Sequence, residues 1–120
     1  MKFEITTRRV FAAAHQLRLY DGSLEPLHGH NWVVRVTVGA EKLDAIGVVM
    51  DFHELDRQVE GILAGWHNRH LNEVEEFLSL NPSTEHVAVV VAGRLKLPGG
   101  VMVVSVEVWE TEGNSAVYRS

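Results

Sequence analysis

The strongest constraint on the fold comes from two extended segments that approach each other at histidine residues. Residues 2–14 begin with alternating polar and apolar side chains and end in an apolar run that is followed by His15. Residues 28–38 alternate almost throughout, and His28 and His30 share the parity of the apolar positions. Because side chains on a strand point alternately to opposite faces, both histidines leave the same face. The pattern predicts an antiparallel strand pair, joined by a loop, that brings three imidazoles to one end.

Three converging imidazoles with a fourth position left open are typical of a catalytic zinc site. The sequence has no cysteine, so nitrogen and oxygen atoms are the ligands available to any metal. Zn²⁺ is the expected ion, although iron, nickel or copper would also suit this ligand set. The alternative interpretation is that His15, His28 and His30 are surface side chains, or core groups with ordinary hydrogen-bond partners.

Two helices are predicted in the second half of the chain. Asp51 is a good N-cap, Glu54 completes a capping-box-like pair, and apolar residues follow at helical spacing until Gly65. The sequence Asn-Pro-Ser-Thr-Glu at 81–85 starts a second helix. We expect this helix to continue to about Lys96, although its valine run would also suit a strand.

Two further strands complete the predicted fold. Residues 101–110 alternate clearly, and a turn at 112–114 leads into a last strand at 116–119. The order of elements is therefore ββααββ, an α+β fold in which residues 1–120 form one domain.

Charge and hydropathy exclude several classes of function. The formal net charge of −5 does not fit a nucleic-acid-binding protein, which needs a clustered basic face. No segment resembles a signal peptide or a membrane span, so we expect a cytoplasmic protein without a membrane partner.

Several polar residues are candidates for a role beside the metal. Glu110 continues the apolar face of its strand, where it either emerges into solvent or accepts two N–H bonds from a flat heterocycle such as guanine or pterin. Ser83 and Thr84 are helix caps, and they become ligand contacts if that helix end faces the same pocket. Glu25 is either a surface loop residue or, three positions before His28, a general base.

His67 and His70 lie in residues 66–80, a segment that we expect to be irregular or partly helical. Neither histidine has an obvious packing role there. They are either exposed side chains or groups that exchange protons with a substrate.

Taken together, these motifs resemble the 6-pyruvoyltetrahydropterin synthase and 6-carboxytetrahydropterin synthase family from end to end. The matching motifs are Phe-Ala-Ala-Ala-His at 11–15, Leu-His-Gly-His-Asn at 27–31, Gly-Val-Val-Met-Asp-Phe at 47–52, Leu-Asn at 71–72, Asn-Pro-Ser-Thr-Glu at 81–85, and Glu-Thr at 110–111 with Tyr118. Their number and their order make the resemblance specific.

The resemblance implies a T-fold, in which a four-stranded antiparallel sheet carries two helices on one face. It also implies a homo-oligomer, in which three chains close a twelve-stranded barrel and two barrels stack into a hexamer with active sites between subunits. Zinc is then held by His15, His28 and His30. The ring of a small-molecule pterin substrate is anchored by Glu110, with help from Ser83 and Thr84.

Two positions depart from the family pattern. Leu24 stands where the family usually has its catalytic cysteine, whereas Glu25 resembles the glutamate of a subgroup with the motif Glu-x-x-His-Gly-His. That subgroup cleaves the side chain of 7,8-dihydroneopterin triphosphate and releases 6-hydroxymethyl-7,8-dihydropterin, a folate precursor. The usual Asp-His acid/base dyad is replaced by His67 and Asn68, so His67 or His70 would have to transfer the proton from a shifted position.

The sequence therefore predicts a zinc-dependent lyase that acts on a carbon–oxygen or carbon–carbon bond of a dihydropterin, with Glu25 as the base. One alternative is the 6-carboxytetrahydropterin synthase reaction of queuosine and deazapurine biosynthesis, which the missing cysteine disfavours. A second is a catalytically degenerate T-fold protein that sequesters or senses a pterin or purine, which the altered dyad favours. A third is a structural zinc protein without a small ligand.

Overall fold

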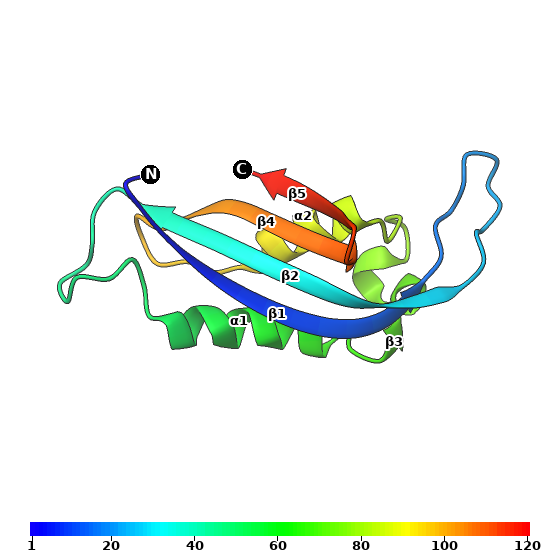
Figure 1. The fold of residues 1–120 in the computed structure, drawn as a ribbon, viewed down its shortest axis with the longest axis horizontal. Coiled ribbons are helices and arrows are strands. Elements are labelled where there is room, and N and C mark those ends of the chain that lie inside the picture. The colour runs from blue at the N-terminus through cyan, green and yellow to red at the C-terminus, as the bar shows by residue number, and fades with distance from the viewer.

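Two long antiparallel strands form the centre of the fold in the computed structural model, which describes residues 1–120 (Figure 1). β1 (Phe3–His15) pairs with β2 (His28–Ala40) along its whole length, in a register that sets His15 opposite His28. The molecule is elongated, 52 Å by 27 Å by 24 Å. The loop between the two strands projects from one end, and both termini lie toward the other end (Figure 1). The predicted strand pair is confirmed.

Three more strands complete the sheet. β2 pairs with β4 (Met102–Thr111), and β4 pairs with β5 (Asn114–Arg119), all antiparallel. The predicted four-stranded antiparallel sheet is confirmed as the main part of the structure. However, the sheet has five strands in the order β3-β1-β2-β4-β5, because the two-residue strand β3 (Arg69–His70) lies parallel to the end of β1. β5 forms one outer edge of the sheet. β1 forms the other edge from its start to Ala12, because β3 pairs only with Ala13 and Ala14.

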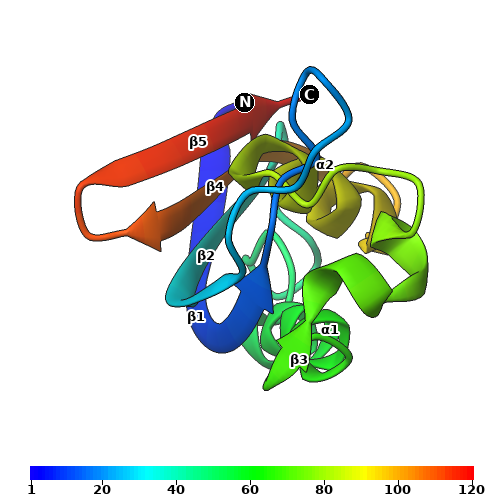
Figure 2. The same ribbon diagram turned by 90° about the vertical axis from the view of Figure 1, so that its right-hand side faces the viewer.

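Both helices cover the same face of the sheet, as Figure 2 shows. α1 (Phe52–Ala64) packs against β1, and α2 (Thr84–Arg94) packs against β4 and β5. Two 3₁₀ turns, Leu71–Glu73 and Glu75–Phe77, lie between the helices and confirm the partly helical character expected there. No helix combines the length and the apolar character that crossing a lipid bilayer requires.

The helix starts follow the predicted capping residues, with two corrections. The Asp51 carboxylate accepts a hydrogen bond from a backbone N–H of the first turn of α1, and the Ser83 hydroxyl does the same for α2. The predicted capping box is wrong, because the Glu54 carboxylate binds Arg57 and Gln58 instead of reaching back to the cap. The second helix ends two residues before Lys96, where the backbone becomes extended.

One contiguous apolar core fills the space between the helices and the sheet. Phe11 of β1 stacks on Trp32 of β2 with ring centroids 5.7 Å apart, and both side chains are buried. The Trp32 indole N–H donates to the backbone carbonyl of Ala13 at 3.1 Å, so this large side chain has no unsatisfied polar atom. Because His28 and His30 continue the parity of Trp32, the histidines extend the core face of the sheet toward its end.

Candidate metal centre

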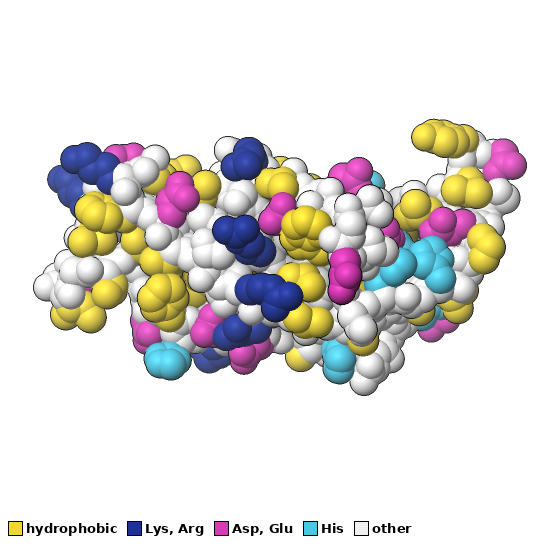
Figure 3. Space-filling view, viewed as in Figure 1, with side chains coloured by type: hydrophobic (Ala, Val, Ile, Leu, Met, Phe, Trp, Pro, Cys, Tyr) yellow, Lys and Arg dark blue, Asp and Glu magenta, His cyan; other side chains and the backbone are white.

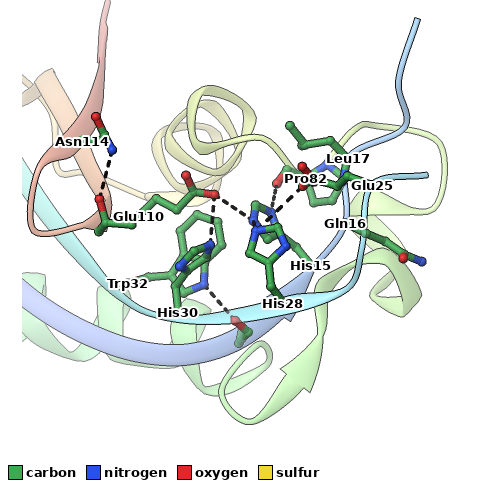
Figure 4. Close-up of polar contacts among 12 residues, drawn as sticks. His15, Gln16, Leu17, Glu25, His28, His30, Trp32, Pro82, Glu110 and Asn114 are labelled. Atoms are coloured by element: carbon green, nitrogen blue, oxygen red, sulfur yellow. Dashed lines mark hydrogen bonds and ion pairs between the residues drawn. The ribbon is translucent and has the colours of Figure 1, made fainter. Parts of the chain in front are cut away.

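Three histidines and one glutamate converge where the loop 16–27 leaves the sheet (Figure 4). The ligand atoms of His15, His28, His30 and Glu110 all lie within 4.8 Å of one another. His15 Nε2 is 3.1 Å from His28 Nε2 and 2.7 Å from Glu110 Oε1, and the same carboxylate oxygen is 3.3 Å from His30 Nε2. In Figure 3, histidine side chains gather at this end of the molecule beside acidic ones. The predicted convergence of the three histidines is therefore present in the fold.

Backbone carbonyls orient two of the imidazoles. His15 Nδ1 lies 2.8 Å from the carbonyl oxygen of Pro82, and His28 Nδ1 lies 2.8 Å from that of Pro26. A carbonyl only accepts hydrogen bonds, so each Nδ1 carries the hydrogen and each Nε2 presents a lone pair. Two lone pairs facing each other at 3.1 Å repel unless a cation or a proton lies between them.

The third imidazole lacks a hydrogen-bond partner. His30 Nε2 is buried and forms no hydrogen bond, although Glu110 Oε1 is 3.3 Å away. Burial lowers the pKa of His30 below the usual histidine value, and the Glu110 carboxylate acts in the opposite direction. A buried nitrogen without a partner is destabilising, and a metal ion beside it would relieve that cost. The residues present therefore fit a metal ion held by the three imidazole nitrogens, with the Glu110 carboxylate beside it.

Strand alternation directs Glu110 toward the cluster. Glu110 keeps the parity of the buried Val108, and its carboxylate enters the histidine cluster. It lies at the end of β4, where the pairing with β2 has ended at Trp109 and the register with β5 shifts between Trp109 and Thr111. The sequence predicted a ring anchor here but gave no sign of contact with the metal-binding histidines.

Glu25 lies at the edge of the cluster, as expected. Its carboxylate oxygen Oε1 accepts a hydrogen bond from the backbone N–H of Leu17 at 3.0 Å, and it lies 3.8 Å from His28 Nε2. The backbone N–H of Glu25 in turn donates to the Leu17 carbonyl at 3.0 Å. Since its side chain is 26% exposed, the carboxylate is held in place but remains accessible to a bound molecule.

Two asparagines that sequence reasoning left without a role hold the chain just beyond His15. The Asn72 side chain bonds both the N–H and the carbonyl of Gln16, at 3.0 and 2.8 Å. The Asn81 side chain bonds both groups of Arg18, at 2.8 and 3.2 Å. Their only signal in the sequence is their place in the Leu-Asn and Asn-Pro motifs at 71–72 and 81–82.

His67 and His70 do not contact the cluster of their own chain. His67 is exposed, and its Nδ1 accepts a hydrogen bond from the Ala12 N–H at 3.1 Å, on the outer edge of β1. His70 Nδ1 lies 3.3 Å from Glu73, and its Nε2 is buried without a hydrogen-bond partner. His70 lines the same cavity as His30, but no hydrogen bond or ion pair joins the two side chains.

The start of α2 faces the cluster. Pro82, whose carbonyl bonds His15, directly precedes Ser83 and Thr84. Both residues are half-buried, and the Ser83 hydroxyl caps the helix by accepting the His86 N–H at 3.1 Å. The start of α2 therefore lies beside the histidine cluster, and ligand contact by Ser83 and Thr84 stays a prediction.

Known proteins share both the sequence and the fold. Residues 4–120 match the family model described as 6-pyruvoyl tetrahydropterin synthase. The chain is 35% identical over 112 residues to dihydroneopterin monophosphate aldolase of Pyrococcus furiosus, covering 92% of this chain and 91% of that protein. It is 33% identical to 6-pyruvoyl tetrahydrobiopterin synthase of Homo sapiens, with coverage of 97% and 90%. The 6-carboxy-5,6,7,8-tetrahydropterin synthase of Synechocystis is also 33% identical, with coverage of 92% and 88%. The solved structure of Caenorhabditis elegans 6-pyruvoyl tetrahydropterin synthase matches with a TM-score of 0.80 at 26% identity, covering 98% of this chain and 96% of that one.

Proposed function

Because this chain belongs to the 6-pyruvoyl tetrahydropterin synthase family, we propose that it is a zinc-dependent lyase that cleaves the side chain of a 7,8-dihydroneopterin phosphate. The product would be 6-hydroxymethyl-7,8-dihydropterin. The observation that carries the proposal is the convergence of His15, His28 and His30, with a glutamate carboxylate at the edge of the cluster. That glutamate, Glu25, lies 3.8 Å from His28 Nε2, within reach of a molecule bound at the cluster.

The three imidazoles would hold zinc through their Nε2 atoms. Zinc, when bound, polarises a side-chain hydroxyl of the substrate and makes its proton more acidic. The carbonyls of Pro26 and Pro82 keep two of the Nε2 lone pairs directed at the ion. The cluster contacts involve only Oε1 of Glu110, which leaves the second oxygen for the N–H groups of the pterin ring.

Glu25 would act as the base. It takes the proton from the hydroxyl on the second side-chain carbon, which becomes the aldehyde carbon of the departing glycolaldehyde phosphate. The bond between the first and second side-chain carbons breaks, and its electron pair passes into the conjugated pterin ring. A proton delivered to the first carbon completes the hydroxymethyl group, so the step needs no oxidant or reductant. The Leu17 N–H keeps the Glu25 carboxylate in one orientation for this transfer.

The returning proton would come from a neighbouring subunit. β1 and β4 both run toward the histidine end, whereas β5 runs away from it, and β1 and β5 are the outer strands that a barrel of three chains would join. An antiparallel pairing of one chain's β5 with the next chain's β1 places both histidine ends on the same side of the ring. His67, which lies against Ala12 at the outer edge of β1, would then approach the β4–β5 turn, next to the end of β4 that carries Glu110. This arrangement supports His67 or His70 of the partner subunit as the acid.

The assay that tests the function compares two substrates. Zinc-loaded protein is incubated with 7,8-dihydroneopterin triphosphate and, separately, with the monophosphate, which the name of the Pyrococcus furiosus relative suggests. We expect chromatography to show 6-hydroxymethyl-7,8-dihydropterin from at least one of them. If both substrates are recovered unchanged while pterin binding is tight, the protein is a pterin-binding member of the family and the lyase proposal fails.

The 6-carboxytetrahydropterin synthase reaction is the second candidate, because the Synechocystis relative carries that name. The absence of any cysteine disfavours it, since the family's usual nucleophile or base at that position is missing. The same assay distinguishes the two activities, because a carboxylated tetrahydropterin and a hydroxymethyl dihydropterin separate on the column.

Replacing Glu110 should separate ring binding from metal binding. We expect Glu110→Gln to weaken pterin binding about 10- to 100-fold, because the neutral amide loses a charge-assisted pair of hydrogen bonds worth about 1.5–3 kcal/mol. Zinc affinity should change much less, since three imidazoles remain. Calorimetry with a dihydropterin and with zinc measures both quantities. A large loss of zinc affinity with unchanged pterin affinity would show that Glu110 is a metal ligand and not a ring anchor.

A further inference from the structure

We propose that Asn72 and Asn81 are positioning residues, which hold the backbone of residues 16–18 so that Glu25 and His15 meet the substrate and the metal correctly. The inference rests on the proposed function, because it takes Glu25 as the base and His15 as a metal ligand. It concerns the part of the site that no regular secondary structure supports.

Residues 16–18 lie beyond the ladder between β1 and β2, and their one backbone pairing is an isolated antiparallel bridge between Arg18 and Leu24. The pairing of β1 with β2 ends with His15 opposite His28, and the chain then enters the loop. Even so, Gln16 and Arg18 each have both backbone groups bonded, because an asparagine side chain approaches each of them. An amide side chain offers an acceptor and a donor, as a backbone peptide does. The two asparagines therefore hold both backbone groups of Gln16 and of Arg18 where the ladder between β1 and β2 has ended.

Leu17 lies between Gln16 and Arg18, and its backbone orients Glu25. Its N–H donates to Glu25 Oε1, and its carbonyl accepts the N–H of Glu25, both at 3.0 Å. The Leu17 N–H lies in the same peptide plane as the Gln16 carbonyl, which Asn72 holds, and the Leu17 carbonyl lies in the same plane as the Arg18 N–H, which Asn81 holds. Loss of either asparagine lets one of these two planes turn, and the Glu25 group bonded to it turns as well. A misplacement of about 1 Å in a catalytic group lowers turnover by about 100-fold.

Asn81 has a second connection that Asn72 lacks. The next residue, Pro82, supplies the carbonyl that bonds His15 Nδ1 at 2.8 Å. The Asn81 carbonyl is itself bonded by His86 Nδ1 at 2.7 Å, so the turn before α2 is fixed from both sides. Loss of the Asn81 side chain should therefore disturb the orientation of His15 as well as that of Glu25.

The chain contains a matched control for these side-chain-to-backbone contacts of Asn72 and Asn81. Gln58 bonds both backbone groups of Lys96, each at 2.8 Å, and so joins α1 to the segment after α2, outside the cluster. Gln58, Asn72 and Asn81 are all half-buried. Replacing any of the three by alanine removes two side-chain-to-backbone hydrogen bonds, and Gln58→Ala also removes a bond to the Glu54 carboxylate, so Gln58→Ala should lose at least as much stability as the asparagine variants.

The test compares Asn72→Ala, Asn81→Ala and Gln58→Ala as full-length, zinc-loaded proteins. We expect the melting temperature to fall in all three, and in Gln58→Ala at least as much as in the asparagine variants. Both asparagine variants should lower kcat about 10- to 100-fold with little change in KM, and Asn81→Ala should also weaken zinc binding in competition with a chromophoric chelator. Gln58→Ala should change neither quantity. Asn72→Asp should not recover the lost kcat, because it keeps the acceptor for the Gln16 N–H but sets a carboxylate oxygen against the Gln16 carbonyl.

A further measurement keeps the inference independent of turnover. Hydrogen exchange of the Leu17 amide should become faster in both asparagine variants and stay unchanged in Gln58→Ala. Equal protection of Leu17 in all proteins, or equal kcat in the asparagine variants and the Gln58 control, would overturn the positioning role. Failure of the proposed function gives a different result, namely no product from the wild-type protein. In that case the exchange rate of the Leu17 amide still decides whether the asparagines hold this backbone.

Discussion

Glu25→Gln should lower the turnover of a 7,8-dihydroneopterin phosphate by about 100- to 10,000-fold, the usual contribution of a general base. Glutamine keeps the size of the side chain, and its amide oxygen can still accept the Leu17 N–H. The local geometry is therefore preserved, but the amide cannot take a proton. Single-turnover product analysis measures the effect, and zinc affinity should stay within about threefold because Glu25 is not one of the converging ligands.

The control for this variant is Glu41→Gln, which removes an equal charge from an exposed side chain in the loop that follows β2. It should retain wild-type turnover. Wild-type turnover by Glu25→Gln as well would remove Glu25 from the mechanism and favour an acid and base supplied entirely by the neighbouring subunit.

His15→Ala should weaken zinc binding by more than about 100-fold. Removing a residue that only hydrogen-bonds to a metal ligand already weakens binding by about 10- to 100-fold, and His15 is itself a proposed ligand. His15 is fully buried, its Nδ1 bonds Pro82, and its ring lies edge-on to Trp32 with centroids 4.8 Å apart. The substitution removes a ligand, leaves the Pro82 carbonyl without its partner and opens a cavity. We therefore expect the free energy of unfolding of the metal-free protein to fall by about 2–4 kcal/mol.

His28→Ala separates these two effects. His28 is 39% exposed, so its loss should weaken zinc binding to a similar degree while changing the stability of the metal-free protein much less. Chelator competition and chemical denaturation of both variants make the comparison. If His28→Ala binds zinc as tightly as the wild type, the three-histidine site is wrong.

The sequence was sufficient for the features that depend on local pattern. The parity of His28 and His30 follows from strand alternation, and the caps at Asp51 and Ser83 depend on residues within one helical turn. The predicted capping box is absent because the Glu54 carboxylate pairs with the Arg57 guanidinium, one helical turn further on, instead of accepting a hydrogen bond from the cap backbone. Local rules thus predicted the elements well and the competition between side chains less well.

Features that depend on contacts between distant segments could not be predicted from the sequence. A two-residue strand such as β3 is too short to show any periodicity, and it exists because residues 69–70 meet the end of β1. The approach of Glu110 to the histidines depends on the register of β4 against β2. The contacts of Asn72 and Asn81 with the backbone of residues 16–18 depend on the packing of separate loops against that segment.

The most direct test of the central claim is a zinc titration of the metal-free protein with product formation as the readout. Our account predicts that formation of 6-hydroxymethyl-7,8-dihydropterin rises linearly with added zinc and stops rising at one zinc per chain. It predicts no such rise for His15→Ala at the same zinc concentrations. Product formed equally well without zinc, or no product at any zinc concentration, would contradict the account.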